Sequence, residues 1–363
     1  MFGQDTPKLF KHQDETASFI VDHPRVYIAS DPGTGKTAAV ITGVLQRDEG
    51  KTLVLAPLSI LEPSWGNDIR TFAPTAQFNI AHGKHRITAV TDSCHFTISN
   101  HDAVNWLVNM PEGTFDQYDT LVIDESTAFK NRTSQRSKAL KKLSKHFKNI
   151  ILMSGTPNSN TVCDLWHQYF LLDGGERLSP TFYKFQNQMC IPEINFQAGR
   201  QFKTWTDRPD ATELIADMVK DITIRHKFED CIDIPEHSMH TLTLDMPAWV
   251  SKQYKELSEH GVLETEHGII NTAHAGAKIK KMLQLLSGAL YNEEGNAVKV
   301  HDERYRLVMD LIKERDHCVI AFNWKHEVAA LKEWAAKRDY NFSYAVIDGS
   351  VSMEDRAKAV EDF

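Results

Sequence analysis

The 363-residue sequence predicts an α/β protein of two lobes, the first of which is built on a parallel β-sheet. Three observations lead to this prediction. Short apolar runs alternate with helical patterns through residues 1–157, which is typical of βαβ units. A helical pattern then dominates from about 158 to 223, and an α/β pattern returns from Cys318. A prior of roughly 150 residues per domain also favours two domains.

Composition and charge exclude several classes of protein. Hydrophobic residues make up 41% of the chain and charged residues 25%, which is enough apolar content to bury a core and too much for a disordered chain. Lys and Arg number 41 against 49 Asp and Glu, and the net charge of -8 excludes a wholly basic nucleic-acid coat. Any polyanion must therefore bind one local face.

Cysteine spacing and the absence of long apolar runs predict the compartment. The five cysteines include no CxxC pair, which fits a reducing interior and argues against a zinc site. No run is apolar enough for a signal peptide or a membrane span. We expect a soluble cytoplasmic protein of a bacterium or a virus-infected cell, nuclear if eukaryotic, with no membrane partner.

Five strands are expected in the first lobe, which should cover residues 1–235. Aliphatic or β-branched runs bounded by turn residues or charges lie at 26–30, 52–56, 96–99, 120–124 and 149–153. Because helix-length intervals separate these runs, they should form a parallel sheet flanked by helices. The tract 158–223 has helical spacing and many aromatic residues, so it is predicted to be a helical insertion.

The second lobe is expected over residues 236–363, after a break at Ile234-Pro235-Glu236. Another helical tract, about 240–300, opens it. A strand, a helix and a second strand follow at 319–322, 326–338 and 344–347. Ser352 then caps a last predicted helix. Because a parallel sheet of two strands is too small to be stable, this lobe is predicted to be incomplete.

The sharpest functional signal is Ser30-Asp-Pro-Gly33-Thr-Gly35-Lys36-Thr37, which follows a predicted strand and opens a predicted helix. Glycines let a phosphate chain approach bare backbone N–H groups, and the helix N-terminus adds partial positive charge. Gly33, Thr34 and Gly35 are predicted to cradle the phosphates of a nucleotide. Lys36 should reach the terminal phosphates and Thr37 should bind Mg²⁺ through its hydroxyl. The alternative is a tight turn with an incidental lysine.

Two adjacent carboxylates end the predicted strand 120–124. At the carboxyl edge of a parallel sheet, one carboxylate can hold Mg²⁺ and the other can polarise an attacking water. We assign Asp124 to the metal and Glu125 to the general base, and with Lys36 they are the candidate catalytic residues. Taken alone, the pair fits a solvated strand end equally well. Its position downstream of the phosphate loop favours the catalytic interpretation.

A third motif, Ser154-Gly155-Thr156-Pro157, follows another apolar strand. The order strand-GKT, strand-DE, strand-SGTP resembles the motor core of superfamily 2 helicases, and more narrowly the Swi/Snf family of double-stranded DNA translocases. The resemblance implies two RecA-like lobes, the second incomplete here, ATP and Mg²⁺ as cofactors, and duplex DNA as partner. It also implies that Ser154 and Thr156 couple the nucleotide site to movement.

Further segments carry the same resemblance. Phe10-Lys-His-Gln13 is similar to the motif whose glutamine reads adenine, which implies that Gln13 contacts the nucleotide. Leu55-Ala-Pro57-Leu-Ser-Ile-Leu61, followed by Trp65, resembles a motif whose loop touches a DNA strand. The nucleic-acid contacts implied in this part of the chain are Pro57, Leu58, Ser59, Ser99 and Asn100. Ile224-Arg225-His-Lys-Phe, with Ile234-Pro235-Glu236, resembles the segment that links the two lobes.

Two departures from the family pattern carry expectations of their own. The family's DEGH tetrad is DEST here, so coupling is expected to run through Ser126 or Thr127. The sequence also stops where the last two family motifs should begin, the second of which supplies arginine fingers. We therefore expect this chain to bind ATP and DNA but to hydrolyse ATP slowly, and a version extended by roughly 80 to 150 residues to turn over.

A basic stretch follows the carboxylates. No acidic residue lies between Ser126 and Cys163, whereas the segment contains Lys130, Arg132, Arg136, Lys138, Lys141, Lys142, Lys145 and Lys148. A local positive field of this kind can replace counterions on a phosphate backbone. Lys130, Arg132, Lys138, Lys141 and Lys142 are therefore candidate nucleic-acid contacts. Apolar residues at helical spacing in the same segment also fit a solvated helix face, and both interpretations can hold at once.

Taken together, these motifs predict an ATP-dependent translocase or helicase that moves on duplex DNA, expected as a monomer. Two alternatives stay open. One is an RNA helicase of the same superfamily. The other is an ATP-gated nucleic-acid-binding module with little turnover.

Overall fold

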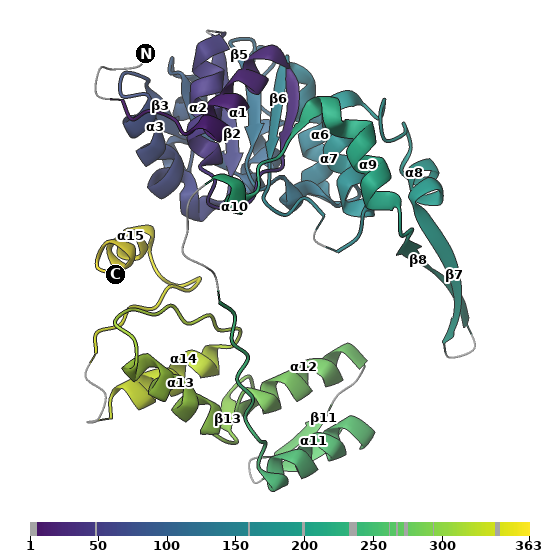
Figure 1. The fold of residues 1–363 in the computed structure, drawn as a ribbon, viewed down its shortest axis with the longest axis vertical. Helices are drawn as coiled ribbons and strands as arrows, with labels where there is room; N and C mark the ends of the chain where they lie inside the picture. Colours follow the sequence, from purple (N-terminus) through teal and green to yellow (C-terminus); the bar gives the residue numbers. More distant parts are fainter. Residues whose placement is uncertain are drawn as a thin grey trace. The chain divides into compact units, whose positions relative to one another are not determined.

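The computed structural model describes residues 6–47, 49–158, 160–197, 200–231, 238–260, 262–265, 268–271, 275–292, 294–337 and 342–363. The chain divides into two compact units, Met1–His237 and Ser238–Phe363 (Figure 1). The predicted break at Ile234-Pro235-Glu236 lies outside the described residues. No helix in the described part of the chain is long and apolar enough to cross a membrane.

A seven-stranded sheet forms the centre of the first unit, in the order β3-β4-β2-β5-β6-β1-β9. Its strands are β1 (Arg25–Ile28), β2 (Lys51–Ala56), β3 (Phe78–Ile80), β4 (Phe96–Asn100), β5 (Tyr118–Ile123), β6 (Asn149–Met153) and β9 (Thr223–Ile224). Every neighbouring pair is parallel. The predicted α/β class is confirmed, and each of the five predicted strands forms. The edge strands β3 and β9 are too short to show a strand pattern.

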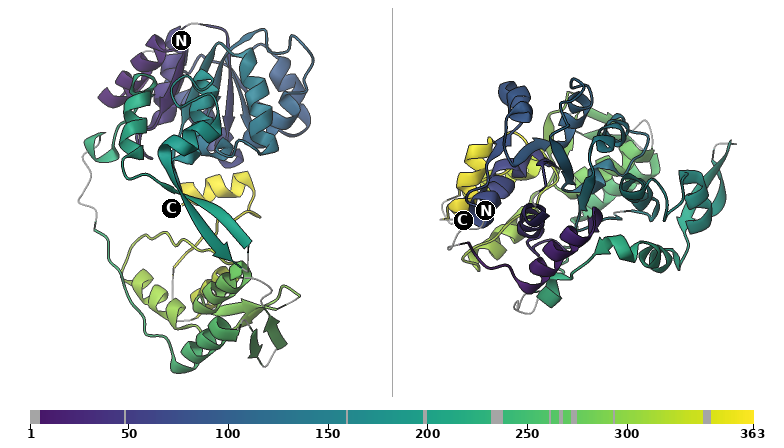
Figure 2. Two further views of the ribbon diagram at one scale, coloured as in Figure 1. Left: turned by 90° about the vertical axis from the view of Figure 1, so that its right-hand side faces the viewer. Right: turned by 90° about the horizontal axis from the view of Figure 1, so that it is seen from above.

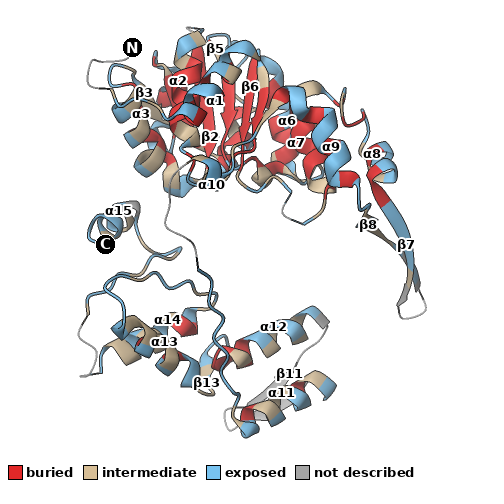
Figure 3. Ribbon diagram, viewed as in Figure 1, coloured by how far each residue is buried: buried red, intermediate tan, exposed pale blue. Residues whose placement is uncertain are grey.

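Burial on both faces explains why these sequences form the centre of the sheet. Successive side chains of a strand point to opposite faces. Leu53 and Leu55 accordingly lie in one core cluster, whereas Val54 and Ala56 lie in the other, and all four are fully buried. Strands covered on both faces contain unbroken apolar runs, and β2, β5 and β6 are buried along almost their whole length and end in such runs (Figure 3).

Helices cover the two faces of the sheet, as the views of Figure 2 show. One face packs against α1 (Lys11–Asp22), α2 (Lys36–Arg47) and α3 (Asn67–Phe72), which contribute Ile20, Val40 and Ile69 to its core. The other face packs against α4 (Arg86–Thr91), α5 (Val104–Leu107), α6 (Gln135–Leu143) and α7 (Cys163–Asp173).

The predicted helical insertion is only partly helical. It contains α7, α8 (Phe182–Met189) and α9 (Ala211–Val219), but also an antiparallel hairpin of β7 (Cys190–Gln197) and β8 (Arg200–Asp207). The hairpin extends away from the sheet (Figure 1). Its second strand is rich in threonine and aromatic residues, which favour strands, so the prediction that the whole tract is helical is wrong here. The short helix α10 (Phe228–Cys231) follows β9.

The second unit has a smaller core. It contains α11 (Ala248–His260), α12 (Ala275–Leu286), α13 (Glu303–Lys313), α14 (Lys325–Ala335) and α15 (Met353–Glu361). Two antiparallel hairpins pair β10 (Val262–Thr265) with β11 (Gly268–Asn271) and β12 (Ala289–Tyr291) with β13 (Ala297–Lys299). Its fully buried apolar cluster consists of Val250, Leu257, Leu285 and Leu290.

The two strands predicted in the second unit do not form in the described structure. Residues 319–322 and 344–347 belong to no strand, and Val319 is 84% exposed. An apolar run becomes a strand only when neighbouring strands complete its hydrogen bonds and cover its side chains. The predicted cap does form, because the Ser352 hydroxyl accepts a hydrogen bond from the backbone N–H of Asp355 at the start of α15.

Candidate nucleotide-binding site

Three loops that carry the predicted motifs meet at one edge of the sheet. They follow β1, β5 and β6, which are neighbours in the order β5-β6-β1, and parallel strands end at the same edge. Asp124 and Glu125 both act electrostatically on the Lys36 ammonium. The Ser154 hydroxyl donates a hydrogen bond to Glu125 Oε2 at 3.3 Å. The fold therefore brings the three motifs together.

The phosphate loop requires glycine at two positions. Gly33 has φ 83° and Gly35 has φ 70°, in the left-handed region that other residues rarely adopt. A Cβ atom on Gly35 would lie 2.0 Å from Gln13 Nε2, and one on Gly33 would lie 2.9 Å from the Phe228 ring. The loop leads directly into α2, whose first-turn N–H groups favour an anion.

Lys36 lies folded against its own loop. Its Nζ donates to the carbonyl oxygens of Ser30 and Asp31, each at 3.0 Å. Burial lowers the pKa of Lys36, and the nearby carboxylates of Asp124, Glu125 and Asp31 oppose that shift. A partly desolvated cation beside an anion-favouring helix end is well suited to hold phosphate oxygens.

The predicted adenine motif, at the start of helix α1, contacts the phosphate loop through two side chains. His12 Nε2 lies 2.8 Å from the Thr34 carbonyl oxygen, and Gln13 Nε2 donates to that oxygen at 3.3 Å. The Gln13 side-chain oxygen Oε1 accepts a hydrogen bond from the backbone N–H of Phe10 at 2.9 Å. A hollow of about 580 Å³ lies beside these residues, lined by Phe10, Lys11, His12, Glu15, Arg225, His226, Lys227, Asp230 and Cys231.

Ser30 stands where the usual phosphate loop has glycine, and the structure gives its hydroxyl a partner. It accepts a hydrogen bond from the backbone N–H of His226 at 3.0 Å. Asp31 adds two contacts, since its N–H donates to the His226 carbonyl at 3.0 Å and its carboxylate accepts from the Phe228 N–H at 3.1 Å. Ser30 and Asp31 therefore hold His226 and Phe228 against the phosphate loop, and glycine at position 30 could not supply the hydroxyl contact.

Asp124 is a buried carboxylate, only 6% exposed. Its Oδ2 accepts from the Trp65 indole N–H at 3.0 Å, and its Oδ1 accepts from the Glu125 backbone N–H at 2.9 Å. Burial raises the pKa of Asp124, and the Trp65 hydrogen bond opposes the increase. Trp65 was not among the predicted site residues, although it lies in a segment that carries the family resemblance.

The oxygen atoms at this edge suit Mg²⁺. The ion prefers oxygen ligands and is usually bound by one or two carboxylates together with waters and substrate phosphates. Asp124 supplies a carboxylate whose desolvation a cation would offset, and Thr37 supplies a half-buried hydroxyl in the first turn of α2. The described residues contain no group of three or more His, Cys, Asp or Glu that could hold a metal by itself. The phosphate oxygens of a bound nucleotide, together with waters, would have to complete the coordination shell of the ion.

Glu125 adopts a strained backbone conformation, with φ 50°. A residue other than glycine in the left-handed region costs of order 1–3 kcal/mol, and such strain concentrates at functional sites. The Ser154 hydroxyl that contacts the Glu125 carboxylate also accepts from the Thr156 backbone N–H at 3.2 Å. The predicted coupling residues Ser154 and Thr156 therefore lie in one chain of contacts with Glu125.

The predicted nucleic-acid contacts near the other loops differ in exposure. Leu58 and Ser59 are exposed and Pro57 is half-buried in the loop after β2. Asn100 is half-buried at the end of β4. Ser99, in contrast, is fully buried and its hydroxyl donates to the Ala81 carbonyl at 2.7 Å, so its side chain faces the protein interior rather than a ligand.

The basic stretch divides into cations with partners inside the protein and lysines on an exposed face. Lys130 pairs with Asp164 at 2.9 Å, and the Arg132 guanidinium lies 4.1 Å from the centre of the Phe182 ring. Lys141 Nζ lies 4.2 Å from the centre of the Phe170 ring while the residue as a whole stays exposed. Lys138, Lys142 and Lys145 are exposed on or next to α6.

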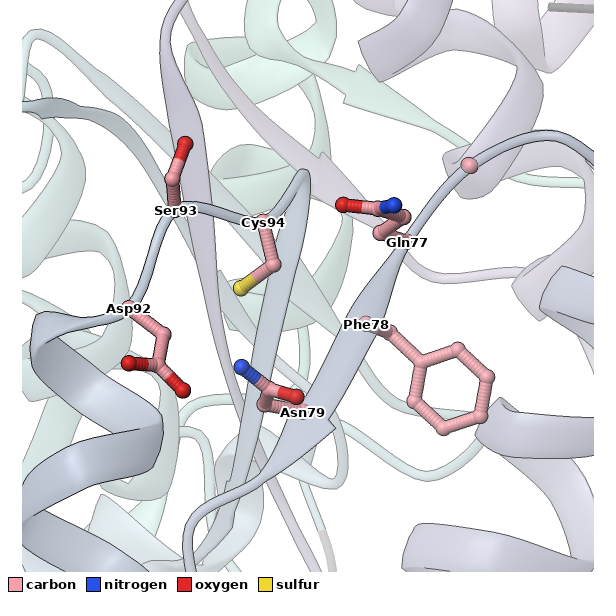
Figure 4. Close-up of a pocket in the computed structure, with 7 residues that line it drawn as sticks. Gln77, Phe78, Asn79, Asp92, Ser93 and Cys94 are labelled. Carbon is pink, nitrogen blue, oxygen red and sulfur yellow. The ribbon is translucent and has the colours of Figure 1, made fainter.

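A second hollow, of about 510 Å³, lies at the amino ends of β3 and β4 (Figure 4). It is lined by Ala76, Gln77, Phe78, Asn79, Asp92, Ser93 and Cys94. The nucleotide motifs follow the carboxyl ends of their strands, so this hollow lies at the other end of the sheet and contains none of the predicted site residues.

Comparison with known proteins agrees with these motifs. Residues 12–293 match the model of the SNF2-related domain. The chain is similar to protein p41 of Acyrthosiphon pisum secondary endosymbiont phage 1, with 29% identity over 90% of this chain and 74% of p41. It is also similar to the ATP-dependent DNA helicase DDM1 of Arabidopsis thaliana, with 24% identity over 93% of this chain but only 47% of DDM1.

A solved structure shares the fold. The SWI2/SNF2 ATPase core of Sulfolobus solfataricus, solved in complex with dsDNA, matches 100% of this chain and 77% of its own, with a TM-score of 0.51 and 18% identity. The family model spans most of the chain, from the adenine motif through all three loops of the nucleotide site. The chain therefore belongs to the SNF2-related domain family.

Proposed function

We propose that this chain is the ATP-hydrolysing motor of a translocase that moves on duplex DNA. One observation carries the proposal: the phosphate loop, the paired carboxylates and the 154–157 loop converge at neighbouring strand ends in a chain of the SNF2-related family. Membership of that family supports ATP hydrolysis of the helicase or translocase type and dependence on a nucleic acid.

Nucleotide binding is assigned to the phosphate loop and α1. Lys36 exchanges its two carbonyl partners for the β and γ phosphates, and the N–H groups around Gly33 and Gly35 hold the remaining phosphate oxygens. Gln13 and the hollow beside it receive the adenine. Thr37 and Asp124 hold Mg²⁺, which neutralises charge on the phosphates when it is bound.

Hydrolysis is assigned to Glu125. Its carboxylate accepts a proton from the attacking water, and the hydrogen bond from Ser154 orients it. Asp124, in contrast, has both oxygens already engaged with Trp65 and the Glu125 N–H, which suits a fixed metal ligand better than a base. The two carboxylates therefore have separate roles.

The nucleic-acid grip is assigned to the loop at Pro57, Leu58 and Ser59 and to exposed lysines of α6. These lysines can contact phosphates without breaking an ion pair inside the protein, unlike Lys130. Duplex DNA is favoured because the archaeal core of the same fold was solved with dsDNA and the plant relative is named a DNA helicase.

The test compares ATP hydrolysis by the full chain with duplex DNA, single-stranded DNA and RNA of matched sequence. We expect hydrolysis to be slow, as the sequence predicts, and to be stimulated most by duplex DNA. Greater stimulation by RNA would favour the RNA helicase alternative. Binding of ATP and DNA without stimulation by any nucleic acid would favour an ATP-gated binding module. Glu125→Gln provides the background rate.

A further inference from the structure

A buried hydrogen-bond cluster around Gln168 joins the loops of the nucleotide site. The Gln168 amide oxygen accepts from the Tyr27 hydroxyl at 2.8 Å and from the Ser126 hydroxyl at 2.6 Å. Its NH₂ group donates to the carbonyl oxygens of Pro157 and Asp164, both at 2.9 Å. An amide accepts two hydrogen bonds and donates two, so this side chain is saturated and its orientation is fixed.

The partners of Gln168 come from three segments that carry the chemistry. Tyr27 lies in β1, the strand that leads into the phosphate loop. Ser126 directly follows Glu125, and Pro157 ends the 154–157 loop. One amide on α7 therefore connects all three motifs.

Because the cluster is buried, each of its hydrogen bonds strongly restricts the positions of the side chains that it joins. Tyr27 and Gln168 are 0% exposed and Ser126 is 1% exposed. Water cannot replace a lost partner there, and a buried polar group without a partner is costly. Burial also raises the pKa of Tyr27 far above its usual range, so its hydroxyl stays a hydrogen-bond donor.

We infer that Gln168, together with Tyr27 and Ser126, is a positioning residue that fixes the Glu125 carboxylate relative to the 154–157 loop. Glu125 has the strained φ of 50°, which persists only where neighbouring contacts hold it. Of the two candidates that the DEST tetrad offers for coupling, Ser126 is the one that enters the cluster. The inference rests on the proposed role of Glu125 as general base.

The expected loss of hydrolysis rate can be estimated from the precision with which a reacting group must be placed. A displacement of about 1 Å at a reacting group can cost about 10²-fold in rate. Loss of the Gln168 amide would leave the Ser126 hydroxyl with the Tyr27 hydroxyl, 2.9 Å away, and would loosen the adjacent Glu125 backbone. The hydrogen bonds of Lys36 and Gln13 do not involve Gln168, so nucleotide affinity should not change.

The experiment measures single-turnover ATP hydrolysis by Gln168→Leu, Tyr27→Phe and Ser126→Ala, with the affinity for a fluorescent ATP analogue and the melting temperature of each. We expect the hydrolysis rate to fall by about tenfold or more, with nucleotide affinity kept within about twofold. If Gln168→Leu fails to fold, Tyr27→Phe and Ser126→Ala decide, because each removes a single hydroxyl.

Tyr169→Phe is the matched control. Tyr169 is also buried, its ring stacks on that of Tyr27 at 5.2 Å, and its hydroxyl contacts Thr223 Oγ1 at 3.0 Å outside the cluster. The Tyr169→Phe variant should have a lower melting temperature than the wild type and the same hydrolysis rate. An equal loss of rate in Tyr27→Phe and Tyr169→Phe would mean that the cluster is merely structural, and would overturn the inference.

Combination with Glu125→Gln separates positioning from the proposed function. Tyr27→Phe should have no further effect in that background, because the group it positions is gone. An unchanged rate in Tyr27→Phe and Ser126→Ala, beside a large loss in Glu125→Gln, would overturn the positioning role alone. If Glu125→Gln itself kept the wild-type rate, the proposed function would fail instead.

Discussion

The loops of the nucleotide site and helix α6 carry the two main sets of predicted functional residues, and they are built differently. Side chains of the loops are tied to other segments, as Asp124 is to Trp65 and Ser30 is to His226. Lysines of α6 point to solvent, and Lys141 rests only against an aromatic ring. The role proposed for the loops requires a fixed geometry, whereas the nucleic-acid contact proposed for α6 requires only summed charge.

This contrast predicts how the two regions respond to substitution. A site in which each group has one position loses its activity when one group is removed. A set of exposed like charges loses affinity in steps, because each charge contributes a similar amount and salt screens them all. The predictions below test this difference, from the largest expected effect to the smallest.

Glu125→Gln should have the largest effect. The amide keeps the shape of the side chain but cannot accept a proton, so the rate of ATP hydrolysis should fall by about 10²- to 10⁴-fold with ATP binding retained. Asp124→Asn should instead weaken Mg²⁺-dependent binding. Pre-steady-state hydrolysis and binding titrations with and without Mg²⁺ separate the two. Identical behaviour of both variants would contradict the division of roles.

Lys36→Ala should lower ATP affinity by about 100-fold, since no other side chain of the loop places a cation on the terminal phosphates. The fold should persist, because Lys36 contacts only carbonyl oxygens of its own loop. A ligand at 100 times its Kd stabilises a protein by about 2.7 kcal/mol, so a melt with ATP and Mg²⁺ detects the loss. Equal stabilisation of wild type and variant would count against the phosphate-loop assignment.

The same contrast explains what the sequence could predict. The five central strands and the motifs after β1, β5 and β6 were predictable because each is a local pattern whose neighbours complete it. Residues 319–322 have an equally good strand pattern but no strand beside them in the described structure. An apolar or β-branched run indicates only that a segment suits a sheet, not that a sheet is present.

Contacts between distant segments were beyond prediction from the sequence. The Gln168 cluster joins residues 27, 126, 157 and 168, and nothing in their spacing shows that they meet. Ser30 did carry a signal, because a serine at a glycine position of the phosphate loop invites a search for its partner. Lys130 and Arg132 have the composition of a DNA contact, but only the fold shows Asp164 and Phe182 beside them.

Charge reversal on α6 tests the other side of the contrast. Changing Lys138, Lys141 and Lys142 to Glu should weaken duplex DNA binding by about ten- to a hundredfold at low salt and leave ATP affinity unchanged. The slope of log Kd against log salt should become shallower by about 0.9 for each lost phosphate contact. Reversal of the exposed Lys8, Lys84 and Lys220 changes the net charge equally and is the control. An unchanged slope would leave only the solvated-face interpretation.

His167, on α7, links the two regions and gives the smallest predicted effect. It is 3% exposed, and its Nδ1 lies 2.7 Å from the Phe129 carbonyl oxygen, so Nδ1 carries the proton of a neutral ring. The pKa of His167 is lowered to about 4, mainly by burial and with smaller contributions from the cations Lys141 and Arg132, while the hydrogen bond with the Phe129 carbonyl opposes the shift. In the unfolded chain, His167 therefore becomes protonated below about pH 6.5. In the folded protein, the same ring becomes protonated only below about pH 4.

Stability should accordingly fall as the pH decreases through that window, and His167 should have no such effect above pH 7. His167→Gln keeps an N–H donor for the Phe129 carbonyl but does not titrate. Urea unfolding should show that the wild type loses about 1–2 kcal/mol more than this variant between pH 7 and pH 5. Lys141→Gln should change that difference only slightly, because burial is the larger cause of the shift. If Lys141→Gln changed this pH-dependent loss of stability by a large amount, charges of α6 would act strongly on their buried neighbours. The contrast between the two regions would then fail at this position.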